Sequence, residues 1–279
     1  MIEAKNIKKT YKDGTQAVKG MSFVLDKKVT SIIGHNGAGK TTLIRMLSTQ
    51  LLPTSGTASI NGHDIIKDVM AVRKTTVSIP QEINPIGWIT VFDNLRLYLH
   101  ARGLPIKESK LRAEKAMKEI GIWDIRNKHA ADISGGQKRK IFVGMAIASG
   151  ADTIFLDEPT TGLDPFSRIQ VWSAIRKAKG QVVLTTHYME EAQSLSDDVL
   201  MVDKGKILSK GSVRQLLKPL EKMVRVESMK KRSNSIPVGN TWVSYVKREE
   251  AESFVMEGDI IKPITLDDIF IKKGVNLES

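Results

Sequence analysis

One segment of the chain has residue types and a spacing that suit the binding of phosphate. It matches the pattern G-x-x-x-x-G-K-[ST] with Gly34, His35, Asn36, Gly37, Ala38, Gly39, Lys40 and Thr41. Glycines let backbone N–H groups curl around phosphate oxygens, and the start of a following helix adds partial positive charge. Lys40 supplies a full charge, and the Thr41 hydroxyl can ligate Mg²⁺. The pattern therefore predicts a phosphate-binding loop.

A second candidate lies where an apolar segment, residues 153–156, ends in Asp157 and Glu158. Ligands of α/β proteins bind at the carboxyl ends of strands, so acids in this place can face a substrate. Asp157 would hold Mg²⁺ through water, and Glu158 would polarise an attacking water as general base. Two acids often end a strand, and only the upstream loop turns this pair into the second motif of a P-loop NTPase.

Three further features are ordinary when each is taken alone. The segment Ser134-Gly135-Gly136-Gln137 caps the start of a predicted helix, which gives a second place where an anion can bind. Gln81 follows the strand predicted over 77–79, and His187 follows the strand predicted near 182–186. A lone histidine after a strand is usually just packed or solvated, so the weight of these features comes from their combination.

The elements that must position these residues are short strands that alternate with helices. Residues 29–33 are an apolar, β-branched run that leads directly into the loop, and residues 41–47 have helical spacing. Further strands and helices are predicted in alternation over 153–156, 165–178, 182–185, 189–195 and 199–202. This alternation predicts an α/β fold with a mixed, mostly parallel core sheet.

The remaining regions depart from that alternation. Residues 2–7 and 17–25 are predicted to pair as an N-terminal antiparallel β subdomain, with a turn at 11–14. A helical subdomain is predicted at about 88–149, with helices over 90–101, 107–120 and 135–148. After about Pro219 the pattern becomes short strands and a closing helix. We therefore predict one large unit over 1–217 and a small C-terminal α+β appendage over 218–279.

Composition excludes several classes of protein. The chain has 279 residues and no cysteine, which rules out disulfides, thiolate metal sites and a cysteine nucleophile. No apolar stretch is long enough to cross a bilayer and the first residues lack a secretory pattern, so we expect a cytoplasmic protein. The net charge of +12 permits nucleic acid, but aromatic residues are only 5% and hardly interleave the basic segment at 100–140. Nucleic acid is therefore not an expected partner.

In combination, the motifs resemble the ATP-binding subunit of an ABC transporter. They occur in the order of that family: Tyr11 as the adenine-stacking aromatic, 34–41 as Walker A, Gln81 as Q-loop, 133–137 as signature, 154–159 as Walker B, 161–165 as D-loop and His187 as H-loop. The resemblance covers about the first 217 residues, and its one departure is Ile133 in place of the usual leucine. It implies the ABC version of the P-loop NTPase fold.

The resemblance also implies an ATPase with ATP and Mg²⁺ as cofactors. The implied catalytic residues are Lys40, Gln81, Glu158 and His187, and the implied metal ligands are Thr41, Gln81 and Asp157. The nucleotide would be bound by Tyr11, by the loop as far as Thr42, and by the signature residues Ser134, Gly135, Gly136 and Gln137.

The partners that the resemblance implies are a second cassette and a membrane permease. Two copies of the chain would pair head to tail as a homodimer, with each ATP between Lys40 of one chain and residues 134–136 of the other. The pair would then lie on the inner face of the cell membrane, bound to integral membrane subunits. The sequences of residues 89–105, 186–212 and 264–270 resemble those of cassettes of drug and lipid exporters of the ABC-2 type. An iron–sulfur assembly ATPase and an importer ATPase are the alternatives left open.

Overall fold

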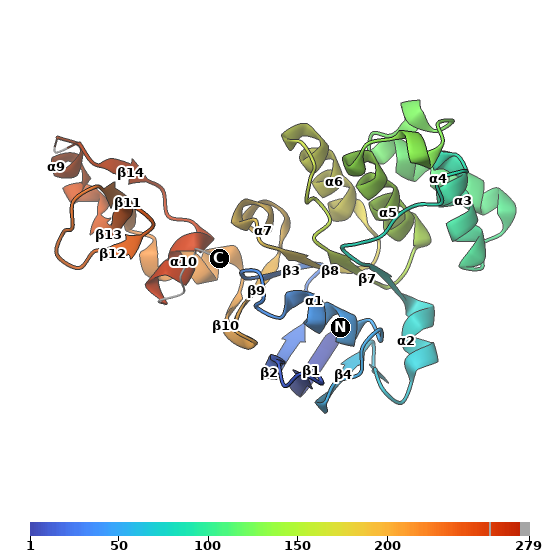
Figure 1. Ribbon diagram of the computed structural model, residues 1–279, viewed down its shortest axis with the longest axis horizontal. Coiled ribbons are helices and arrows are strands. Elements are labelled where there is room, and N and C mark those ends of the chain that lie inside the picture. Colours follow the sequence, from blue (N-terminus) through green and yellow to red (C-terminus); the bar gives the residue numbers. More distant parts are fainter. Residues whose placement is uncertain (257, 274–279) are drawn as a thin grey trace.

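Three β-sheets organise the chain, and the computed structural model describes residues 1–256 and 258–273 (Figure 1). The central sheet has six strands in the order β10-β9-β3-β8-β7-β6. Its strands are β3 (Val29–Ile33), β6 (Thr76–Ile79), β7 (Thr153–Asp157), β8 (Gln181–Thr186), β9 (Asp198–Asp203) and β10 (Lys206–Gly211). All of its pairings are parallel except that of β9 with β10. The predicted α/β fold with a mixed, mostly parallel sheet is therefore confirmed.

The N-terminal sheet is antiparallel and covers one side of the first helix. Its order is β2-β1-β4-β5, with β1 (Ile2–Thr10), β2 (Gln16–Leu25), β4 (Ser55–Ile60) and β5 (His63–Asp64). The turn between β1 and β2 is closed by a bond from the Gly14 N–H to the Tyr11 carbonyl at 3.0 Å. Helix α1 (Lys40–Leu47) packs its apolar face between this sheet and the central sheet, so the residues before it are held on both sides.

A group of helices stands at the β6 end of the central sheet. It contains α3 (Val91–Ala101), α4 (Ile106–Glu119), α5 (Gly135–Ser149), and the short 3-10 turns η1 (Trp123–Ile125) and η2 (Ala130–Asp132). Thr90 caps α3 by accepting a bond from the Asp93 N–H. Ser134 and Gln137 form a reciprocal capping box at the start of α5, with bonds of 3.3 and 3.1 Å. Helices α6 (Pro165–Lys177) and α7 (Met189–Leu195) follow the next two strands.

Several elements were not predicted because their sequences carry no clear period. Helix α2 (Val69–Thr75) buries only Val72, so no apolar stripe marks it. Strand β10 is an edge strand that is nowhere fully buried. The other unpredicted elements are short as well: β5, η1, η2, α8 (Val213–Leu217), η3 (Lys218–Leu220), β12 (Ile236–Val238), η4 (Arg248–Glu250) and α9 (Ala251–Met256).

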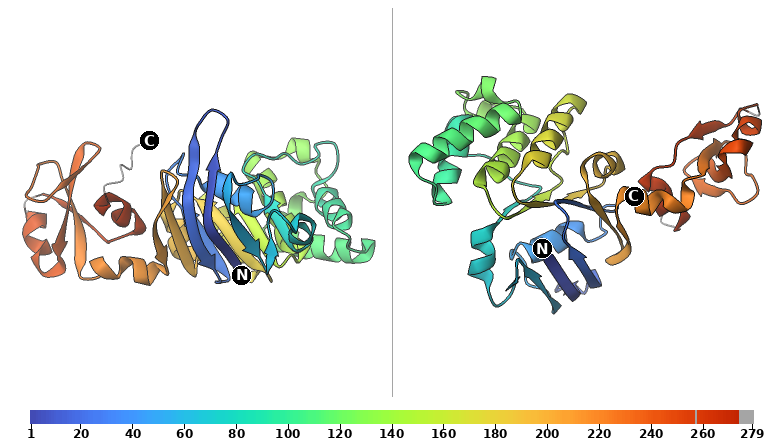
Figure 2. Two further views of the ribbon diagram at one scale, coloured as in Figure 1. Left: turned by 90° about the horizontal axis from the view of Figure 1, so that it is seen from below. Right: turned by 180° about the vertical axis from the view of Figure 1, so that it is seen from behind.

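The third sheet lies at the far end of the molecule from the helices α3 to α5 (Figure 2). Its order is β12-β13-β11-β14, with β11 (Met223–Ser228), β13 (Thr241–Lys247) and β14 (Ile260–Lys262). The last helix, α10 (Leu266–Lys272), leaves this sheet and packs against α7 and α8. Over the described residues, no helix has both the length and the apolar character that crossing a membrane requires.

Candidate functional site

Neighbouring parallel strands bring the sequence-predicted residues to one edge of the central sheet. At its carboxyl end, β3 leads into the loop that begins at Gly34. Strand β7 ends at Asp157, and Glu158 follows it directly. Gln81 follows β6, and His187 follows β8. Because β6, β7, β8 and β3 lie side by side in this order, residues more than a hundred positions apart in the sequence meet.

The loop between β3 and α1 is held in a shape that its glycines permit. Gly39 caps α1 with φ of +99°, a left-handed conformation, and a Cβ there would lie 2.3 Å from the Ala17 carbonyl oxygen. The Lys40 Nζ donates to the carbonyl oxygens of Gly34 at 2.7 Å and His35 at 3.0 Å. Burial lowers the pKa of Lys40, while the negative charges of Glu158 and Asp157 act in the opposite direction. The loop thus holds a cation and free N–H groups, which suits phosphate oxygens.

Asp157 lies behind the loop and is 2% exposed. Its Oδ1 accepts a hydrogen bond from the Thr41 hydroxyl at 3.2 Å and another from the Thr185 hydroxyl. These oxygen donors are the kind that Mg²⁺ prefers. Within the described ranges, no group of three or more His, Cys, Asp or Glu side chains is arranged to hold a metal. The ion would therefore take the rest of its shell from phosphate oxygens and water, as Mg²⁺ commonly does.

Glu158 is the most constrained side chain of the site. Its φ is +50°, which is uncommon for a residue other than glycine, and it is 7% exposed. Its Oε2 accepts bonds from the Gln81 Nε2 at 3.3 Å and the Thr161 hydroxyl at 3.0 Å. Its Oε1 lies 3.2 Å from the His187 Nδ1. A carboxylate that is fixed in this way at a strand end can accept a proton from a water held beside it.

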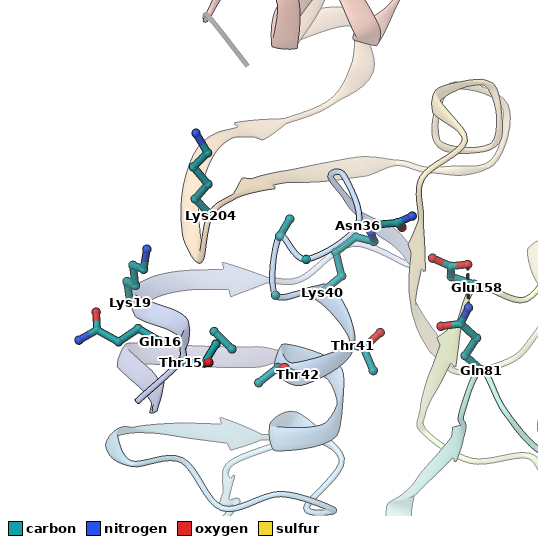
Figure 3. A pocket seen from close by; sticks show the side chains of 14 residues that line it. Thr15, Gln16, Lys19, Asn36, Lys40, Thr41, Thr42, Gln81, Glu158 and Lys204 are labelled. Atoms are coloured by element: carbon teal, nitrogen blue, oxygen red, sulfur yellow. Dashed lines mark hydrogen bonds between the residues drawn. The ribbon is translucent and has the colours of Figure 1, made fainter. Parts of the chain in front are cut away.

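A cavity of about 650 Å³ lies between the loop and Glu158. Figure 3 shows Lys40 and Thr41 on one side and the bonded pair of Gln81 and Glu158 on the other. The wall also includes residues that were not predicted, from β2, the turn before it and the β9–β10 turn: Thr15, Gln16, Ala17, Lys19 and Lys204. No motif marks these residues, and only the tertiary fold places them here.

Tyr11 and the signature residues lie outside this wall. The Tyr11 hydroxyl is 3.1 Å from the Thr42 Oγ1, so the ring is next to α1, but it is not part of the cavity lining. Gly135 and Gly136 line a second cavity of about 330 Å³, together with Arg139 and Thr161, and Gln81 lies on both cavities. One chain therefore does not bring the signature to its own loop.

Comparisons with known proteins identify the family of the chain. The family described as "ABC transporter" matches residues 18–161. The daunorubicin/doxorubicin resistance ATP-binding protein DrrA of Streptomyces peucetius is 37% identical over 219 residues, which are 77% of this chain and 66% of that protein. The human phospholipid-transporting ATPase ABCA3 is 35% identical over 217 residues, or 76% of this chain. The chain spans only 9% to 14% of the length of ABCA3 and six other mammalian relatives.

Solved structures show the same fold. The ATP-binding cassette MJ0796, in a dimeric post-hydrolysis state with ADP and Pi, has a TM-score of 0.70 at 23% identity and covers 77% of this chain and 99% of its own. The cassette cbiO1 from Clostridium perfringens, part of the ABC transporter complex cbiONQ, has a TM-score of 0.67 at 24% identity and covers 78% of this chain and 90% of its own. The predicted family and fold class are confirmed: the chain belongs to the ABC transporter family and contains an ATP-hydrolysing cassette of that family.

Proposed function

We propose that this cassette works as a head-to-tail homodimer and drives a separate membrane permease of the exporter type. The observation that carries the proposal is the contact set of Glu158, which joins the residues after β6, β7 and β8 at the cavity edge. The likeness to DrrA, a drug-resistance ATP-binding protein, supports the exporter type. The likeness to cbiO1 supports the fold alone. We also propose that residues 1–217 form the cassette, with its helical subdomain at about 88–149, and 218–279 an appendage.

Each residue of the site has a chemical role in this proposal. Lys40 and the N–H groups of the loop bind the β- and γ-phosphates of ATP. Thr41, Gln81 and Asp157 would hold Mg²⁺, which would neutralise phosphate charge when it is bound. Glu158 accepts the proton of the attacking water, and His187 keeps the Glu158 carboxylate in place beside the γ-phosphate.

Dimerisation follows from the position of the signature. Ser134 to Gln137 stand at the start of α5, where N–H groups and the helix dipole attract an anion, yet Gly135 and Gly136 line a cavity other than that of Lys40. A second chain, turned by a two-fold axis, can place its own signature over the loop of the first. Two identical chains then form two complete sites.

An exposed apolar segment supports the proposal that a permease docks on this cassette. Ile83, Ile86 and Trp88 follow Gln81, and the side chain of Trp88 is 77% exposed. Exposed apolar residues that gather in one segment are typical of protein contacts. A permease bound here would reach the site through Gln81, and it would place the cassette on the cytoplasmic face of the membrane. An iron–sulfur assembly ATPase or an importer ATPase would keep the same site and differ in the partner that it binds.

Size-exclusion chromatography with ATP tests the dimer. Glu158→Gln should keep nucleotide binding, block hydrolysis and elute as a dimer in ATP but as a monomer in ADP. The matched control adds Ser134→Asp, which retains a helix cap but places a negative charge against the γ-phosphate of the partner site. This double variant should stay monomeric, and a dimer in both variants would refute the composite site.

Trp88→Arg tests the permease. It should release the cassette from its membrane subunits in detergent while ATP hydrolysis by the isolated cassette stays unchanged. Co-purification with a scaffold that lacks membrane-spanning helices would instead favour the assembly ATPase.

A further inference from the structure

The last helix of the described chain, α10, is built into the ATP-binding cassette. Its Phe270 is fully buried. It belongs to one apolar cluster with residues of β3, α7, β9 and α8: Ile33, Met189, Ala192, Val199, Met201 and Leu216. Ile33 is the last residue of β3, directly before the phosphate-binding loop. A helix from the end of the sequence therefore covers the root of that loop.

Phe270 also contacts the loop itself. Its ring meets the ring of His35 edge to face, with centroids 5.3 Å apart and planes at 67°. The His35 Nε2 is buried and makes no hydrogen bond. Burial lowers the pKa of His35, although the negative charges of Asp203 and Asp267 act in the opposite direction. The side chain of His35 thus faces Phe270.

The backbone of His35 belongs to the phosphate cradle. Its carbonyl oxygen accepts bonds from the Lys40 Nζ at 3.0 Å and from the Ala38 N–H at 3.1 Å. The orientation of this peptide group therefore fixes both the lysine and the following N–H groups. A side chain that restrains His35 restrains the groups that bind phosphate.

The opposite face of α10 is fastened to the third sheet. Asp268 is fully buried and accepts a bond from the Tyr245 hydroxyl of β13 at 3.0 Å. Its Oδ1 is also 3.6 Å from the Arg225 Nη1 of β11. The helix is thereby held between the sheet of the appendage and the loop, and Phe270 cannot shift alone.

We propose that Phe270 is a positioning residue, which holds His35 and so keeps the phosphate-binding loop in the shape that binds nucleotide. This inference rests on the proposed nucleotide site and assigns the appendage a part in it. Without the ring contact the loop samples more conformations, and binding must then restrict them. The contact should thus matter for nucleotide affinity beyond its effect on stability.

Calorimetric titration of the full chain with ADP tests the proposal. Phe270→Leu keeps an apolar side chain but removes the ring, and it should raise the Kd for ADP roughly two- to tenfold, the range of an aromatic pair. Ile269→Val is the matched control, because Ile269 lies on the same helix and in the same cluster. It should lower the melting temperature and leave the Kd unchanged. If Phe270→Leu does not fold, Phe270→Met, whose flexible side chain adapts to the gap that the ring leaves, replaces it.

A double-mutant cycle separates positioning from packing. In a His35→Ala background, Phe270→Leu should change the Kd no further, because its partner ring is already gone. The same change in both backgrounds, or no change in either, would overturn the proposal. Lys40→Ala is the reference: if it binds ADP as the parent does, both the nucleotide site and this inference fail. If Lys40→Ala loses affinity for ADP while Phe270→Leu binds ADP as the parent does, only this inference fails and the nucleotide site stands.

Discussion

Replacing Tyr11 by alanine distinguishes two ways of holding the adenine ring. The resemblance to ABC cassettes places adenine on Tyr11, which starts the turn between β1 and β2. The structure bonds its hydroxyl to Thr42 and leaves it out of the cavity wall, where Gln16 and Lys19 lie instead. If the base stacks on Tyr11, it must leave the cavity mouth on the β1 side. If it does not, the wall of β2 is the base site.

The size of the expected effect follows from these contacts. Stacking between an aromatic side chain and a base contributes about 1–3 kcal/mol, so Tyr11→Ala should raise the Kd for ATP roughly 5- to 150-fold. Tyr11→Phe removes only the 3.1 Å contact with Thr42 and keeps the ring. A partly exposed hydrogen bond of this kind contributes about 0.5–1 kcal/mol, so Tyr11→Phe should change the Kd by no more than about fivefold. Because stacking accepts any base, the affinity for GTP should fall in parallel.

Equilibrium titration of the three proteins with ATP and GTP provides the measurement. The stacking role requires that the alanine variant loses much more affinity than the phenylalanine variant, for both nucleotides. Equal affinity in all three proteins would leave Tyr11 as a turn residue. A loss of the same size in both variants would assign the effect to the hydroxyl and refute the stacking.

Two other perturbations test the site and its support. His187→Ala should lower kcat by about 10²–10⁴-fold, since it removes the group that keeps the Glu158 carboxylate in place beside the γ-phosphate, yet leave the Kd for ADP unchanged because ADP lacks the γ-phosphate; a large loss of ADP affinity would contradict its placement. Glu191 is buried and accepts bonds from Thr160 at 2.7 Å and Trp172 at 2.9 Å, and burial raises its pKa. The native state therefore holds this proton more tightly than the unfolded state does, and stability falls as pH rises through the raised pKa. Glu191→Gln should remove that fall, with a gain of about 1–3 kcal/mol over the parent in urea unfolding at pH 8 and little difference at pH 4.

The sequence was sufficient to predict those features that are decided by local pattern and by the order of strands along the sheet. Val29 to Ile33 are rich in β-branched residues, Ser134 is a good helix cap, and parallel strands must end at one edge, so the meeting of Lys40, Glu158 and His187 could be expected. The contacts of Lys204 with the cavity and of Phe270 with His35 could not, because they join distant segments without a local period. Thr161 as a partner of Glu158 was equally hidden, since its role depends on the positive φ of Glu158.

The cluster that joins Ile33 to Phe270 affects how the protein is made. The ribosome delivers the loop and its strand early and the covering helix late. At roughly 5–20 residues per second, the about 240 residues between them take on the order of 12–48 s to synthesise. Throughout that interval the apolar side chains of β3 have no cover from α10, and those of α7 and β9 have none from the time they are synthesised. A nascent chain with such an uncovered surface is a substrate for chaperones and prone to aggregation, so slower elongation just before α10 should lower the yield of folded protein.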